Sequence, residues 1–76
     1  MLPYSNQASD LQLRLAKRVK SLRSSHKLTQ EGLSIKANIA LRHLQKIERG
    51  EVNVTLETLS KLAHALEVDP AELIAR

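Results

Sequence analysis

Residues able to read nucleic-acid bases are concentrated between positions 41 and 49 of the chain. Gln45 and Lys46 follow Arg42 by three and four residues, so on a helix all three share one outward face. A guanidinium can bridge O6 and N7 of guanine, an amide can pair with adenine or contact the backbone, and an ammonium can reach guanine or phosphate. Leu41, at the leading end, either contacts a thymine methyl group or is an ordinary exposed leucine. The pattern predicts a helix that reads base edges in a DNA major groove.

Catalytic and metal-binding chemistry has little support in the same sequence. The histidines, His26, His43 and His64, are widely spaced and lack the pattern of metal ligands. The run Ser24-Ser25-His26 is typical of a polar loop, and the chain has no cysteine and no glycine-rich phosphate loop. We therefore expect a protein that is not an enzyme, with no metal site, no cofactor and no small-molecule ligand.

The charge of the chain is unevenly distributed. The formal net charge is +4 over 76 residues. Residues 1–49 hold ten Lys or Arg and three Asp or Glu, a net +7, whereas residues 50–76 hold two and five, a net −3. A basic part that contains the base-reading helix is what a polyanion-binding surface requires. The alternative is that these basic residues only solvate exposed helix faces. The acidic part is expected to point away from DNA.

Helix-start signals divide the chain into five helices. Four of them are preceded by a hydrophobic staple, in which an apolar residue before the N-cap packs on the fourth helical residue. The staple pairs are Leu28 with Leu33, Ile39 with Leu44, Val54 with Leu59, and Val68 with Leu73, and the caps between them are Thr29, Ala40, Thr55 and Asp69. The first helix is predicted to start near Ser9, with a buried stripe of Leu11, Leu15, Val19 and Leu22. Because no segment alternates with period two, we predict an all-α fold.

The second and third predicted helices, 29–36 and 40–49, are joined by a turn at 37–39. So short a turn makes the two helices cross steeply and lets the second one protrude. Asn38 in this turn tolerates the left-handed conformation that it demands. Ala40 has no side-chain oxygen, so the first amides of the base-reading helix lack their usual partner, and either a DNA phosphate or water takes its place. We expect Ala40 to be buried with Leu44 and Ile47.

The chain is interpreted as one small domain, residues 9–76, preceded by a flexible segment, residues 1–8. The first ten residues lack the apolar run of a signal peptide. No apolar stretch approaches the roughly 20 residues that span a bilayer. Together with the absence of cysteine, these features lead us to expect a cytoplasmic protein without membrane contact.

Segment 28–50 and the helix that follows resemble the Cro/CI-type helix-turn-helix regulators of phages and bacteria, also called the XRE family. The matching positions are Leu28-Thr29-Gln30, Leu33, Ala37, Ile39, Leu44, Ile47-Glu48-Arg49-Gly50, Leu59, Leu62, Ala63, Ala65 and Leu66. The resemblance covers about residues 10–75. It implies a compact five-helix fold like that of the lambda repressor, with the helix-turn-helix formed by helices two and three. Gly32, Asn38 and Ala40 depart from the family pattern and weaken these two helices rather than the fold.

The resemblance also implies roles for individual residues. Gln30 is similar to a helix-two glutamine that bonds a phosphate and braces the recognition helix, and Arg49 and Asn53 match positions that contact the DNA backbone. Arg23 and Glu48 match positions that form a structural ion pair between the first helix and the recognition helix. Further candidates for backbone contact, each with a solvent-facing alternative, are Lys17, Arg18 and His43.

We therefore predict a sequence-specific transcriptional regulator, repressor or activator, that binds a roughly palindromic operator as a homodimer. The acidic carboxy-terminal part is the expected dimer surface, centred on Leu56, Leu73 and Ile74. The small size and the junction after Gly50 are similar to controller proteins of restriction–modification systems. Such a controller activates by contacting RNA polymerase, for which Glu48 and Glu51 are candidates unless they are structural. The alternatives are an antitoxin that also binds a toxin, and a protein-interaction module with the same fold.

Overall fold

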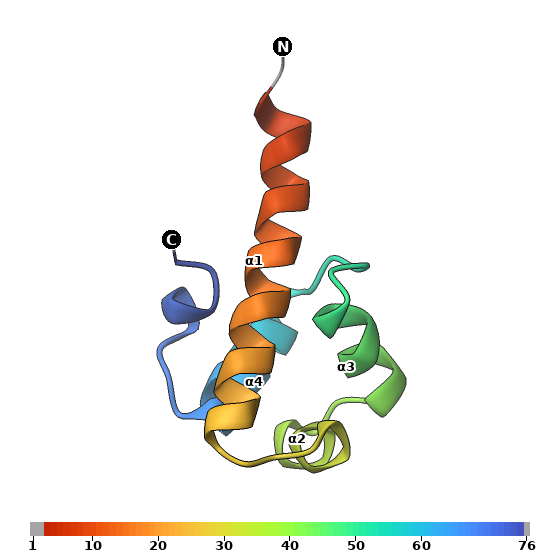
Figure 1. Cartoon of the computed structure of the whole chain (residues 1–76), viewed down its shortest axis with the longest axis vertical. Helices are drawn as coiled ribbons and strands as arrows, with labels where there is room; N and C mark the ends of the chain where they lie inside the picture. Colours follow the sequence, from red (N-terminus) through yellow and green to blue (C-terminus); the bar gives the residue numbers. More distant parts are fainter. Residues whose placement is uncertain (1–2, 76) are drawn as a thin grey trace.

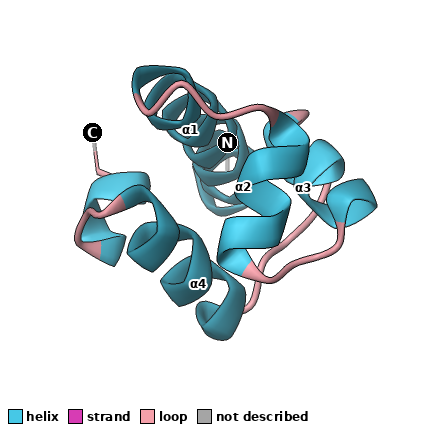
Figure 2. Ribbon diagram, turned by 90° about the horizontal axis from the view of Figure 1, so that it is seen from below, coloured by secondary structure: helices cyan, strands magenta, loops and turns pink. Residues whose placement is uncertain are grey.

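The computed structural model describes residues 3–75 of the chain, and the side chains of residues 10–75. Its elements are α1 (Pro3–Ser25), α2 (Gln30–Ala37), α3 (Leu41–Glu48), α4 (Leu56–Leu66) and a short 3-10 helix, η1 (Pro70–Leu73). The described residues contain no strand, so the all-α prediction is confirmed for them. Figure 1 shows α1 as the central helix, with α3 to one side of it and η1 to the other. The view from below shows α2 and α3 together on one side and α4 on the other (Figure 2).

The starts of the helices follow the caps that the sequence contains. Thr29 accepts a hydrogen bond from the Gly32 amide at 2.9 Å, and Thr55 accepts one from the Thr58 amide at 3.0 Å. Ala40 makes no side-chain cap bond, as expected. Asn38 ends α2 with φ 56° and ψ 51°, the predicted left-handed conformation. The turn between α2 and α3 is therefore as short as the sequence indicates.

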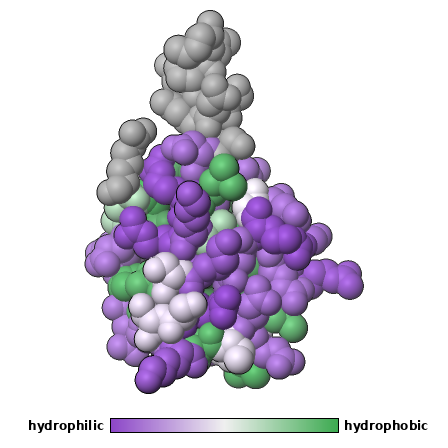
Figure 3. All heavy atoms as spheres, viewed as in Figure 1, coloured by the Kyte–Doolittle hydropathy of each residue, from purple (hydrophilic) through white to green (hydrophobic). Residues whose placement is uncertain are grey.

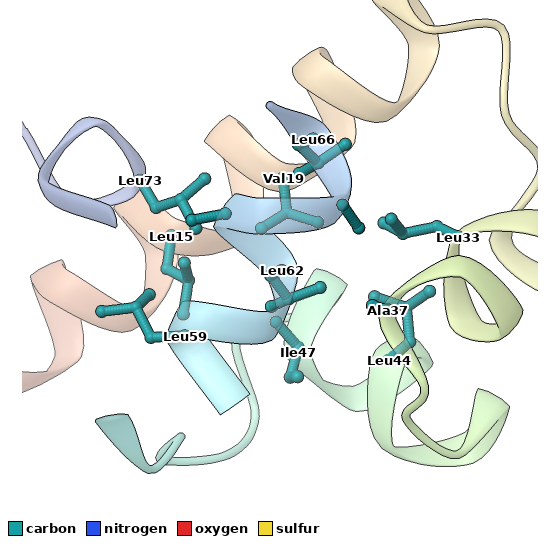
Figure 4. Packing of buried hydrophobic residues seen from close by; sticks show 12 residues of the cluster. Leu15, Val19, Leu33, Ala37, Leu44, Ile47, Leu59, Leu62, Leu66 and Leu73 are labelled. Carbon is teal, nitrogen blue, oxygen red and sulfur yellow. The ribbon is translucent and has the colours of Figure 1, made fainter. Parts of the chain in front are cut away.

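The four staples meet in a single hydrophobic core. Their second members are buried at 8% exposure or less, and their first members are partly buried against the same cluster. The buried members are Leu33, Leu44, Leu59 and Leu73. The same core contains Leu15 and Val19 of α1, Ile47 of α3, and Leu62 and Leu66 of α4, and it lies between the helices (Figure 4). Since burying one such side chain stabilises the fold by about 1.5–3 kcal/mol, this core fixes α2 and α3 against α1 and α4.

Three predictions about the helices are corrected. Helix α1 begins at Pro3, ahead of the predicted Ser9, because proline is well tolerated in a first helical turn. Leu11 is 40% exposed and lies outside the core, since α4 and η1 cover only the later part of the predicted stripe. The fifth helix is the single 3-10 turn η1, the usual form of so short a helix. The proposed boundary after residue 8 falls inside α1, and residues 1 and 2 lie outside the described residues.

The surface in the orientation of Figure 1 is mainly hydrophilic, with apolar atoms in small separate groups (Figure 3). Within residues 3–75, no helix combines the length and the apolar character needed to cross a bilayer. The long dimension of the molecule, 41 Å against 23 and 20 Å, runs along α1 (Figure 1). Helix α3 lies to one side of this long axis, next to α2 (Figure 1).

Candidate nucleic-acid interface

Helix α3 has one buried face and one open face. Leu44 and Ile47 are 0% and 1% exposed and belong to the core, and Glu48 beside them is 3% exposed. On the opposite face, Arg42 and Lys46 are exposed, and neither has an ion-pair partner among the described side chains. The two cations lie one helical turn apart, so the outward face predicted from their spacing is present.

Leu41, His43 and Gln45 are half-buried and flank that open face. Ala40 is exposed, which corrects the prediction that it is buried. The reason is that Ala40 is the N-cap and has extended backbone angles, φ −66° and ψ 139°, so it does not continue the helical face of Leu44. No group of three His, Asp or Glu side chains among the described residues is placed to hold a metal ion.

A buried carboxylate network fixes α3 to the two preceding helices. Arg23 Nε donates to Glu48 Oε2 at 2.8 Å, and Arg23 Nη2 donates to Glu48 Oε1 at 3.1 Å. Gln30 Nε2 donates to the same Oε1 at 3.0 Å, and Arg23 Nη1 donates to the Leu28 carbonyl at 3.0 Å. The ion pair predicted between Arg23 and Glu48 is therefore present, and it also holds the loop before α2. A charge pair buried in this way depends on every partner being in place.

The bond from Gln30 to Glu48 was not anticipated as such from the sequence. The predicted brace on the recognition helix is present, and it acts through the Glu48 carboxylate. An amide nitrogen carries two hydrogens, so one remains for a phosphate. Glu48 is 3% exposed and has three donors, so it is not accessible for the contact with RNA polymerase considered above. Glu51 is exposed and stays a candidate.

The loop that follows α3 has one side-chain contact within itself and one with α1. Arg49 Nε pairs with Glu51 Oε2 at 3.0 Å, and Gln12 Nε2 of α1 donates to Asn53 Oδ1 at 2.7 Å. Both Arg49 and Asn53 are exposed, and their contact with a DNA backbone remains a prediction. Gln12 is a residue that sequence reasoning missed, because nothing in a 41-residue separation signals the contact.

Two of the basic residues of α1, Arg14 and Arg18, bond to the carboxy-terminal residues of the chain. Arg18 Nη2 donates to the Ala75 carbonyl at 3.1 Å, and Arg14 Nη1 donates to the Ile74 carbonyl at 2.8 Å. These bonds direct both arginines toward the carboxy-terminal end, across α1 from α3 (Figure 1). The contact of Arg18 with a DNA backbone stays a prediction, and its bond to Ala75 places it away from α3. Lys17 is exposed and has no partner among the described side chains, so its role stays a prediction.

The residues predicted for a dimer surface differ in exposure. Leu73 is 0% exposed and belongs to the core, so its place in an interface is corrected. The reason is that its staple with Val68 turns it inward. Leu56 and Ile74 are 84% and 37% exposed. Ile74 also borders an open, mainly apolar cavity of about 180 Å³ that is lined further by Leu11, Gln12, Leu15, Val52, Asn53 and Val54.

Comparison with known proteins agrees with this geometry. The Helix-turn-helix family profile matches residues 19–73. The immunity repressor protein of Bacillus phage phi105 is 37% identical over 60 residues, which are 79% of this chain and 42% of that repressor. Control protein C.SmaI of Serratia marcescens is 37% identical over 67 residues, 88% of this chain and 80% of its own length.

A solved structure is similar over nearly its whole length. The restriction–modification controller protein C.AhdI from Aeromonas hydrophila superposes with a TM-score of 0.79 and 34% identity, covering 82% of this chain and 94% of that one. The family profile includes α2, the turn, α3 and the core helix α4. The chain therefore belongs to the helix-turn-helix family, the Cro/CI-type (XRE) transcriptional regulators that its sequence resembles.

Proposed function

We propose that α3 enters a DNA major groove and reads bases with Arg42, Gln45 and Lys46, while Leu41 contacts a thymine methyl group. The observation that best supports this is the contrast between the two faces of α3. Its inner face is fixed by the core and by Glu48, whereas its outer cations have no internal partner among the described side chains. A rigid helix with free donors loses little freedom on binding, which favours specific contacts.

Residues around the base-reading face of α3 hold this helix in position on the duplex. Gln30, His43, Arg49 and Asn53 lie on α2, on α3 and in the loop after α3, and Lys17 is an exposed residue of α1. We assign them to contacts with the sugar–phosphate backbone, which fix register without reading sequence. Arg49 then exchanges Glu51 for a phosphate.

We further propose that two copies bind a palindromic operator, with recognition helices one helical turn of DNA apart. The exposed Leu56 and the apolar cavity beside Ile74 support the carboxy-terminal side as the contact between copies. The similarity to controller proteins suggests that the regulated genes encode a restriction–modification system. Activation would use Glu51, the exposed acidic residue beside α3.

The test begins with selection of binding sites from a randomised duplex library, followed by fluorescence anisotropy on the selected duplex. We expect affinity to fall steeply with salt, because bound phosphates release counterions. Arg42→Ala should cost about 1–3 kcal/mol at one base position and relax its preference. Gln30→Ala should weaken binding to selected and unrelated duplexes alike, while Ile35→Ala, a change at a 79% exposed position of α2 that alters no charge, serves as its control. Weak binding without salt dependence would instead identify a protein-interaction module.

Sedimentation velocity tests the proposed dimer. We expect a dimer at tens of micromolar, and a shift toward monomer for Leu56→Lys, which introduces charge at an apolar contact. Because Leu56 is 84% exposed in the single chain, this change should leave the folded monomer intact. A wild-type monomer both with and without operator DNA would contradict the dimeric arrangement.

A further inference from the structure

The cationic side chains of the described residues form two groups. Each member of the first group has an internal partner: Arg14, Arg18, Arg23, Lys36, Arg49 and Lys61. Each member of the second is exposed and without a partner among the described side chains: Lys17, Lys20, Lys27, Arg42 and Lys46. The second group lies on α1, in the loop before α2 and on α3. Two of its members, Lys20 and Lys27, have no role in the function proposed above.

Lys20 lies on the side of α1 that faces α3. Arg23, three residues later, bonds Glu48 at the end of α3. Leu13, seven residues earlier, packs on Gly50, where an added Cβ would come within 3.0 Å of Leu13 Cδ2. Positions separated by three and seven residues share one helix face, so Lys20 lies on the same flank as these two contacts. Arg18 lies on the opposite flank, toward the carboxy-terminal end.

Lys27 is held beside the start of α2. It adopts a left-handed conformation with φ 57° and donates its amide to the Ser24 carbonyl at 2.9 Å. The next residue, Leu28, accepts the hydrogen bond from Arg23 Nη1 at 3.0 Å. The guanidinium that fixes α3 through Glu48 therefore also fixes the loop that carries Lys27. Thus Lys20 and Lys27 are both positioned relative to α3 by the same arginine.

We infer that Lys20 and Lys27 bind phosphates of the DNA backbone next to the groove that α3 enters, an inference that rests on the proposed function. These two lysines are called the flank below. A helix inserted in a major groove brings the neighbouring surface of its protein onto the sugar–phosphate backbone. Exposed ammonium groups without internal partners neutralise phosphates there without first breaking an ion pair. This contact is independent of base sequence and contributes through the release of counterions.

The experiment measures affinity for the selected duplex and for an unrelated duplex over about 50–300 mM salt. Lys20→Gln and Lys27→Gln each remove one charge from the proposed flank. Lys36→Gln and Lys61→Gln are the matched controls, because these lysines are paired with Glu67 and Glu57. Circular dichroism verifies that each variant is folded.

We expect each flank variant to reduce the salt slope by about 0.9 and the affinity at 0.1 M salt by about eightfold, on both duplexes. The controls should change neither quantity appreciably. The inference is overturned if the flank variants keep the wild-type slope, if they alter base preference alone, or if the controls lose as much. A wild-type protein without salt-dependent binding would overturn the proposed function itself, which distinguishes the two failures.

Discussion

Replacing the buried Glu48 with glutamine tests how the recognition helix is held. The carboxylate accepts three hydrogen bonds, two from Arg23 and one from Gln30, and its side chain is 2% exposed. Glutamine offers one acceptor oxygen and turns an NH2 group toward these donors. It also leaves the Arg23 charge, in a side chain only 19% exposed, without compensation.

Breaking a buried pair in this way costs about 3–5 kcal/mol. A domain of this length has a free energy of unfolding of roughly 4–11 kcal/mol, from about 0.05–0.15 kcal/mol per residue. Glu48→Gln should therefore remove a large part of the stability. In urea unfolding followed by circular dichroism, the midpoint should fall by about 2 M or more. Glu51→Gln is the matched control, because its pair with Arg49 is more than half exposed on both sides and should contribute less than about 1 kcal/mol.

The double variant Arg23→Met with Glu48→Met separates the loss of charge pairing from the loss of packing. The double variant leaves no unpaired buried charge. Its loss in free energy of unfolding should therefore be smaller than the summed losses of the single variants Arg23→Met and Glu48→Met. A loss below about 1 kcal/mol for Glu48→Gln would refute the reasoning. Strictly additive losses in the double variant would refute it as well.

Two smaller perturbations test the ends of α3. Gly50→Ala should lower the free energy of unfolding by about 1–2 kcal/mol, because Gly50 has φ 71° and the new methyl group would meet Leu13 Cδ2 at 3.0 Å. Thermal melting measures this loss, and an unchanged Tm would contradict the prediction. Ala40→Ser should raise stability by about 1 kcal/mol by capping the free amides of α3. If those amides bind a phosphate in the complex, the same serine weakens DNA binding in anisotropy titrations; unchanged affinity would show that water is their partner.

Local signals in the sequence were sufficient for the caps of α2, α4 and η1 and for the turn before α3, but not for the start of α1. The caps at Thr29, Thr55 and Asp69 and the turn at Asn38 act over three or four residues, so their geometry follows from neighbours in the chain. The staples also named core residues correctly, because an apolar side chain next to a helix start is turned inward by that helix. The family resemblance added the pair of Arg23 with Glu48, whose partners are 25 residues apart.

The packing of the helices against one another determines which side of each helix is covered. Helical spacing places Arg14 and Arg18 on one face of α1, but only the position of the carboxy-terminal carbonyls gives them internal partners. Leu73 is equally apolar in an interface or a core, and only the packing of η1 against α1 and α4 buries it. Periodicity within a helix defines faces, whereas burial depends on the neighbours that long-range packing supplies. Local sequence signals were thus enough to predict α3 and its candidate base-reading side chains, whereas long-range packing determines which cations of the described residues have an internal partner.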